Sequence, residues 1–189
     1  MNPTDQPKGD FIPWAQPYFW GDESRHVQDA LASTWISGGA FVDKLESHFR
    51  AFLSVPHALL AANGTAALHL AYLALDIGPG DEIVVPGFGF LAAANIALHL
   101  GAVPVFAEVD PDSWLVTADT IAPCLSPRTK AIVVIHTYGQ MCAMKPILSL
   151  AGSRGIPVIE DAAEALGSRC DRRRSEEHTS ELQSLLIIS

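Results

Sequence analysis

Val158-Ile159-Glu160-Asp161-Ala162-Ala163-Glu164 is the stretch that decides the fold of this 189-residue chain. Its apolar start is typical of a strand buried inside a sheet, and the apolar run ends abruptly in carboxylates. A buried carboxylate is costly to leave without a partner. The stretch therefore predicts a buried strand over residues 157–160, followed by an acidic side chain with a role of its own, Asp161.

Upstream of this stretch, strand-length apolar runs alternate with helix-length runs from residue 57 onwards. The expected strands are residues 57–61, 82–85, 103–107, 131–136 and 157–160. The expected helices are residues 66–75, 91–100, a segment capped by Thr117 that runs to residue 125, and residues 146–154. Strands that alternate with helices imply a mostly parallel sheet covered on both faces. The predicted fold class is α/β, with three layers in the order α/β/α.

The chain divides into three regions by composition. Residues 1–56 are expected to form an extended aromatic arm and two helices, with a break at residues 35–39. Residues 57–171 carry the alternation of strands and helices. Residues 172–189 are interpreted as a non-native tail, because residues 174–184 resemble the translation of a sequencing adapter. The alternative is a genuine short helix with Leu182, Leu185 and Leu186 on one face.

Composition limits the possible functions. Apolar residues make up 49% of the chain and charged residues 17%, enough for a sizeable core, and the net charge of −9 disfavours binding to nucleic acid. The three cysteines show no zinc-binding spacing, so no metal site is predicted, and reduced thiols fit the cytoplasm. The N-terminus lacks the apolar stretch of a signal peptide, and polar residues interrupt both apolar regions, so no membrane span is expected.

Polar and glycine-rich residues gather where the predicted strands end. Gly64 and Thr65 follow the first strand, Phe90 the second, His136 the fourth and Asp161 the fifth. In open parallel sheets, ligands bind beyond the carboxyl ends of the strands. One edge of the sheet is therefore expected to hold all the candidate chemistry.

Two of these features suit the two ends of pyridoxal phosphate. Free N–H groups at a helix start bind phosphate, and Gly64 allows close approach while Thr65 adds a hydroxyl. A carboxylate at Asp161 would keep a pyridine nitrogen protonated, which makes the ring a better electron sink. The simpler alternatives are an Asn-Gly turn with Thr65 as a helix cap, and Asp161 as the cap of a following helix.

Three further residues are candidates for contact with the cofactor. Phe90 could stack on a flat ring, or it could be a core residue beside Phe88. His136 could serve the site, or it could be a hydrogen-bonded structural histidine. Glu164 lies three residues after Asp161 and could reach the phenolic oxygen of the cofactor, or it could complete a helix cap.

The chain resembles the sugar-nucleotide aminotransferases of the DegT/DnrJ/StrS type, which are fold-type I pyridoxal-phosphate enzymes. The matching segments occur in the family's order: W-I-S-G-G-A-F-V-D-K-L-E (35–46), N-G-T-A-A-L-H-L-A (63–71), G-D-E-I-V-V-P (80–86), V-F-A-E-V-D-P-D-S-W (105–114), H-T-Y-G-Q (136–140) and V-I-E-D-A-A-E-A-L-G-S (158–168). Together they cover roughly residues 11–171.

The resemblance implies a role for each candidate residue. Gly64 and Thr65 would bind the phosphate, Phe90 would stack on the ring, and Asp161 would pair with the ring nitrogen. Glu164 stands where many members have glutamine. A glutamate at this position resembles the perosamine-synthase-like members, which aminate a 4-keto-6-deoxyhexose nucleotide and use free glutamate as the amino donor. A homodimer is implied as well.

One departure from the family concerns catalysis. The family's Schiff-base lysine lies beyond the E-D-A-A motif, whereas the lysines of this chain, Lys8, Lys44, Lys130 and Lys145, all precede Asp161. The chain is therefore expected to be an inactive fragment of about half the usual length. The alternatives for the whole protein are a sugar dehydrase with histidine in place of lysine, and a non-catalytic ligand-binding or regulatory module.

The resemblance also implies that residues 57–171 are a partial pyridoxal-phosphate-binding large domain, with part of the sheet missing. In fold-type I enzymes, two strands that follow the strand of Asp161 lie between it and the first strand. Without them, the expected first strand has no neighbour, and an unpaired edge invites aggregation. The isolated chain is therefore expected to fold poorly.

Overall fold

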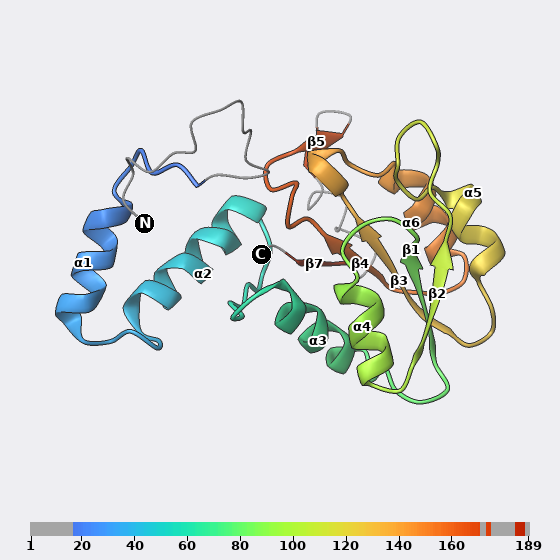
Figure 1. Cartoon of the computed structure of the whole chain (residues 1–189), viewed down its shortest axis with the longest axis horizontal. Helices are drawn as coiled ribbons and strands as arrows, with labels where there is room; N and C mark the ends of the chain where they lie inside the picture. Colours follow the sequence, from blue (N-terminus) through green and yellow to red (C-terminus); the bar gives the residue numbers. More distant parts are fainter. Residues whose placement is uncertain (1–16, 171–172, 175–183, 188–189) are drawn as a thin grey trace, which may run out of the picture. The chain divides into compact units, whose positions relative to one another are not determined.

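A computed structural model describes residues 17–170, 173–174 and 184–187 (Figure 1). The chain forms two compact units, residues 1–45 and 46–189. The first unit holds helix α1 (Glu23–Ser33) and the start of helix α2 (Ala40–Leu53), which continues into the second. The expected pattern of helix, break and helix is confirmed, whereas the expected region boundary after residue 56 stays a prediction.

A parallel sheet forms the centre of the second unit. Its strands are β1 (Glu82–Pro86), β2 (Val103–Ala107), β3 (Thr129–Ile135), β4 (Val158–Asp161) and β7 (Ser184–Ile187). They lie in the order β2-β1-β3-β4-β7, and every neighbouring pair is parallel. Two short strands, β5 (Arg169–Cys170) and β6 (Arg173–Arg174), form a separate antiparallel pair.

Helices cover both faces of this sheet. Helices α3 (Gly64–Ala74) and α4 (Ala92–His99) pack on one face, and α5 (Ala118–Ile121) and α6 (Met144–Gly152) on the other. A 3₁₀ turn (Ala122–Cys124) extends α5, so the helical segment expected after Thr117 is confirmed. Among the described residues, no helix is both long and apolar enough to cross a bilayer.

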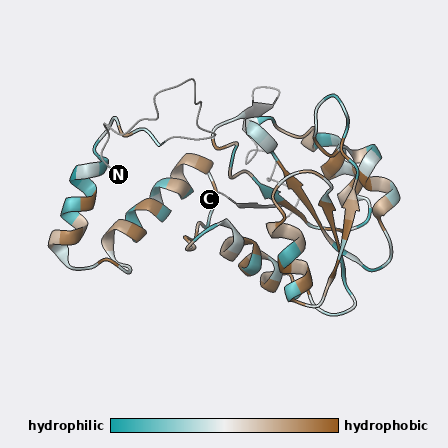
Figure 2. Ribbon diagram, in the orientation of Figure 1, coloured by the Kyte–Doolittle hydropathy of each residue, from teal (hydrophilic) through white to brown (hydrophobic). Residues whose placement is uncertain are grey.

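Alternation along the strands fills two separate cores. Ile83 and Val85 of β1 face α3 and α4, whereas Val84 between them faces the α5 and α6 side. Strand side chains point alternately to opposite faces, so an almost continuously apolar strand supplies both cores. The hydrophobic colour of the central strands in Figure 2 follows from this arrangement. The predicted α/β fold with three layers is confirmed.

The expected first strand, residues 57–61, is wrong. These residues form no strand and pair with none of the described strands. A strand is stabilised by a neighbour that satisfies its backbone groups, and a short apolar run without one stays irregular. The sheet therefore has no unpaired strand at residues 57–61, and the aggregation-prone edge expected there is absent.

The tail also differs from expectation. Residues 184–187 form β7, which pairs with β4 in the register Val158 to Ser184 through Asp161 to Ile187. The alternative of a short helix is wrong for these four residues, while Leu182 lies outside the described residues. Residues 184–187 thus belong to the sheet, which the interpretation of residues 172–189 as a non-native tail did not anticipate. The foreign origin of the tail stays a prediction.

Candidate functional site

Asp161 ends β4 at the carboxyl edge of the sheet, and its side chain is buried. Alternation places it on the same face as Ile159, which packs in the core beneath α3 and α4. Burial raises the pKa of Asp161, and a hydrogen bond from the backbone N–H of Ala163 to Oδ1 (3.1 Å) opposes that rise. No salt bridge reaches Asp161 from the described residues. A cation placed at this carboxylate would offset the cost of its burial.

The direction of helix α3 indicates on which side of the sheet its N-terminus lies. The chain passes from the C-terminal end of α3 through residues 75–81 into the start of β1, so α3 runs antiparallel to that strand. Eleven helical residues rise about 16 Å, close to the roughly 16 Å length of a five-residue strand. From this direction we infer that Gly64 and Thr65, at the start of the helix, lie toward the carboxyl ends of the strands, where β4 presents Asp161.

The start of α3 is capped by Asn63. Its side-chain Oδ1 accepts the N–H of Ala66 (2.9 Å), and its carbonyl accepts the N–H of Ala67 (3.1 Å). The N–H groups of Gly64 and Thr65 precede these bonds and have no acceptor within the helix. Thr65 is exposed and Gly64 is half-buried. The Asn-Gly turn expected as the simpler alternative is therefore real, with Asn63 rather than Thr65 as the cap, and it leaves two donors available to an anion.

Phe90 and Glu164 are both exposed. Phe90 lies just before α4 and is 74% exposed, so the alternative that made it a core residue is wrong. The Glu164 carboxylate accepts the backbone N–H of Tyr138 (2.6 Å). The pKa of Asp161 is raised chiefly by burial, and the charge of Glu164 adds a smaller rise.

His136 is enclosed by the protein. Its side chain is fully buried, Nδ1 accepts the N–H of Cys142 (3.2 Å), and Nε2 lies 3.2 Å from Oε2 of Glu160. Both ring nitrogens therefore have partners within the chain, as in the structural alternative. Alternation along β4 places Glu160 on the face opposite Asp161, so the ring of His136 lies on the α6 side of the sheet.

No helix begins within residues 162–170, the described segment that directly follows Asp161. Residues 163–167 form turns, and Gly167 has φ 83°, in the left-handed region that glycine adopts easily. The carboxylate of Asp161 caps the first of these turns by accepting the N–H of Ala163. The alternative role expected for Asp161, a helix cap, is therefore wrong, because the residue caps a turn. Asp161 and Glu164 therefore do not share a helix face.

Sequence reasoning missed three residues around this edge. Tyr72 of α3 is fully buried, its hydroxyl donates to the carbonyl of Ala93 (3.0 Å), and burial followed by the charge of Asp161 raises its pKa. The Ser168 hydroxyl donates to the carbonyl of Gly139 (2.9 Å), which ties two loops together. Glu160 is fully buried beside His136. The polar residue Glu160 within an apolar strand was the one signal that could have pointed to this contact.

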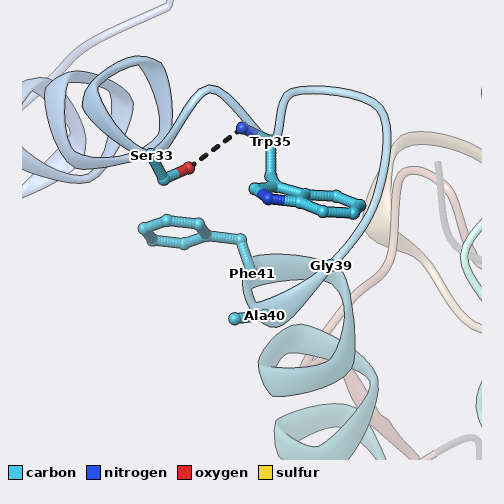
Figure 3. A pocket seen from close by; sticks show the side chains of 5 residues that line it. All are labelled: Ser33, Trp35, Gly39, Ala40 and Phe41. Atoms are coloured by element: carbon cyan, nitrogen blue, oxygen red, sulfur yellow. Dashed lines mark hydrogen bonds between the residues drawn. The ribbon is translucent and has the colours of Figure 1, made fainter.

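None of the described lysines lies among these residues. Lys44 belongs to α2, Lys130 to β3 and Lys145 to α6, while Lys8 lies outside the described residues. Among the residues that the structure describes, no group of three or more side chains could hold a metal ion. A pocket of about 330 Å³ lies in the first unit, lined by Ser33, Trp35, Gly39, Ala40 and Phe41 (Figure 3). It contains none of the predicted site residues.

The residues present fit the two charged ends of pyridoxal phosphate. A buried carboxylate whose pKa is raised by burial suits a cationic ring nitrogen, which would stabilise its charged form. The two N–H groups at the start of α3 suit the phosphate. The exposed ring of Phe90 at the same edge is available for stacking.

The sequence profile of the DegT/DnrJ/EryC1/StrS aminotransferase family matches residues 19–180. GDP-perosamine synthase from Caulobacter vibrioides is 43% identical over 162 residues, which are 85% of this chain and 44% of that protein. The chain thus spans about half the length of the curated relatives that it matches.

Solved structures of similar proteins give the same fold. The crystal structure of 3-amino-5-hydroxybenzoic acid synthase has a TM-score of 0.82 at 34% identity, and covers 91% of this chain and 44% of that one. The putative sugar aminotransferase Spr1654 from Streptococcus pneumoniae, in its PLP form, has a TM-score of 0.81 at 27% identity, over 87% of this chain and 46% of that one.

Proposed function

This chain belongs to the DegT/DnrJ/EryC1/StrS aminotransferase family, and from that premise we propose that it is the N-terminal part of an enzyme that transaminates a nucleotide-linked sugar with pyridoxal phosphate. The observation that carries the proposal is the buried carboxylate of Asp161 at the carboxyl edge of the sheet, on the face covered by α3. In the full-length parent, the cofactor would supply an electron sink for the negative charge that develops on the substrate.

The residues of this chain would hold that cofactor. Asp161 keeps the proton on the ring nitrogen, since an ion pair favours both charged forms. Gly64 and Thr65 bind the phosphate through the N–H groups at the start of α3. Phe90 stacks on the ring, and Glu164 lies near the ring oxygen, held in place by the N–H of Tyr138.

We propose a 4-keto-6-deoxyhexose nucleotide as substrate and glutamate as amino donor. The support is the similarity to GDP-perosamine synthases, 43% identical to this chain in one case, together with Glu164 in the E-D-A-A-E motif. The active parent would be a cytoplasmic homodimer. A purified parent should convert such a sugar nucleotide to its amino sugar while glutamate becomes 2-oxoglutarate, both measured by mass spectrometry. Absence of amino sugar with every keto-sugar nucleotide and donor tested would contradict this activity.

We further propose that the 189-residue chain alone does not turn over substrate. Transamination needs an amine that anchors the cofactor and moves the proton. Lys130 and Lys145 belong to β3 and α6, and none of the four lysines follows Asp161. Amino-sugar formation by the purified 189-residue chain would contradict this part of the proposal.

A further inference from the structure

His136 connects the ends of two neighbouring strands beside the proposed cofactor site. It directly follows β3, and its backbone N–H donates to the carbonyl of Asp161 (3.0 Å). Its side chain contacts Glu160, the residue just before Asp161. A single residue thus holds two consecutive positions of β4, one through its backbone and one through its ring.

The direction of these bonds follows from the partners. Nδ1 receives an N–H from Cys142, so that nitrogen carries no proton. The ring proton is then on Nε2, which donates it to Oε2 of Glu160. Oε1 of Glu160 has no hydrogen-bond partner among the described residues. The bond from His136 is therefore what fixes the Glu160 carboxylate.

The loop after His136 also contacts Glu164, another predicted site residue. The N–H of Cys142 closes the loop back onto the ring, and the Cys142 thiol donates to the carbonyl of Ile135 (3.5 Å). Within this loop, the N–H of Tyr138 binds Glu164. The ring of His136 thereby lies at the base of a loop that contacts the turn after Asp161.

We propose that His136 is a positioning residue, which orients the Asp161 carboxylate toward the cofactor nitrogen through its contacts with Glu160 and the backbone of Asp161. The inference deepens the proposed function and depends on it. His136 is not assigned a contact with the cofactor, because its ring is fully buried on the α6 side of the sheet while Asp161 faces α3. Glu160 acts in the same way, as the acceptor that keeps the ring in place.

Three substitutions in the full-length parent separate this role from general stability. His136→Asn keeps an acceptor for the N–H of Cys142 but is too short to donate to Glu160. His136→Gln reaches Glu160 with an N–H donor. His99→Gln, on the exposed C-terminal turn of α4, is the matched control away from the site.

Two readouts are needed: the Kd for pyridoxal phosphate by fluorescence titration, and the ¹⁵N chemical shift of ¹⁵N-labelled pyridoxal phosphate bound to the protein. His136→Asn should weaken cofactor binding measurably, by up to about 10- to 100-fold, because the lost bond to Glu160 acts on the cofactor only through Asp161 and its own free energy sets the upper limit. Its bound cofactor should show a shift toward the unprotonated ring nitrogen. His136→Gln should restore most of both properties, and His99→Gln should match the wild type.

The outcomes are distinguishable. A wild-type Kd and an unchanged ¹⁵N shift in His136→Asn would overturn the positioning role while the proposed function stands. A wild-type parent that binds no cofactor would overturn the proposed function and this role with it. If His136→Asn does not fold, Glu160→Met removes the same contact from the other side at similar volume, and the same two changes are expected. Wild-type values in that variant would also overturn the role.

Discussion

Replacing Asp161 by asparagine in the full-length parent tests the proposed cofactor site with the smallest change of shape. In the structure, Oδ1 of Asp161 accepts the N–H of Ala163 at 3.1 Å. The amide of asparagine keeps an oxygen that can accept this N–H, so the turn after β4 should be retained. What is lost is the negative charge that faces the cofactor. The substitution therefore separates the electrostatic role of the residue from its structural role.

The expected loss can be estimated from the site. A hydrogen bond to a charged partner contributes about 1.5–3 kcal/mol, which corresponds to roughly 10- to 100-fold in cofactor Kd. Turnover should fall further, because an unprotonated ring stabilises developing negative charge less well, and each 1.36 kcal/mol of barrier is about tenfold in rate. We expect turnover to drop at least 100-fold, or about 3 kcal/mol.

The stability of the apoprotein should not fall with cofactor affinity and turnover. Burial raises the folded-state pKa of Asp161 above 3.8, so its favourable contribution is present below pH 3.8 and is lost as the pH rises through the raised pKa. Tyr72, His136 and Glu164 are the titratable groups around it. At neutral pH, Asp161→Asn should therefore keep or raise the Tm of the apoprotein while weakening the holoenzyme.

The assays are steady-state turnover, cofactor titration, and calorimetric Tm with and without pyridoxal phosphate. Asp110→Asn is the matched control, because Asp110 holds its own turn in the segment between β2 and α5 and has no assigned contact with the cofactor. Unchanged turnover and cofactor affinity in Asp161→Asn would refute the pairing of Asp161 with the ring nitrogen. A lower apoprotein Tm would refute the argument from burial.

Two further predictions concern the elements that carry the site. Asn63→Ala should destabilise the fold by about 1 kcal/mol through loss of the α3 cap, measured by denaturant unfolding, whereas Asn63→Asp should retain the stability; equal unfolding midpoints for all three proteins would contradict the capping role. Burial, and then the charge of Glu160, raises the pKa of Cys142 to about 12, so a thiol reagent at pH 8 should label Cys142 only after unfolding, as peptide mapping would show. Rapid labelling of the native protein at Cys142 would contradict its burial.

The strands around the site could be predicted from their apolar sequences, and the prediction holds where a neighbouring strand pairs with them. Residues 82–85, 103–107 and 131–136 are expected as strands, and β1, β2 and β3 occupy Glu82–Pro86, Val103–Ala107 and Thr129–Ile135. Residues 57–61 have a similar apolar character and still form no strand. Hydrophobicity along the chain does not report whether a pairing partner exists, and that partner decides whether a strand forms.

The position of Asp161 was predictable from the sequence, but the contacts around it were not. The rule for parallel sheets places Asp161 at the carboxyl edge, and the structure puts it there. The contact between His136 and Glu160 depends on the register of β3 against β4, in which Ile135 pairs with Asp161. Such a register is set by packing across the sheet, which no local sequence pattern encodes. The same holds for the loop that brings Tyr138 to Glu164.

Uptake of pyridoxal phosphate by the full-length parent is the most direct test of this account. Purified apoprotein given the cofactor in excess, then desalted, should retain about one equivalent per chain and show its near-visible absorption band. The same protein carrying Asp161→Asn should retain markedly less. A wild-type parent that is folded and yet retains none would contradict the assignment of Asp161, Gly64 and Thr65 to a cofactor.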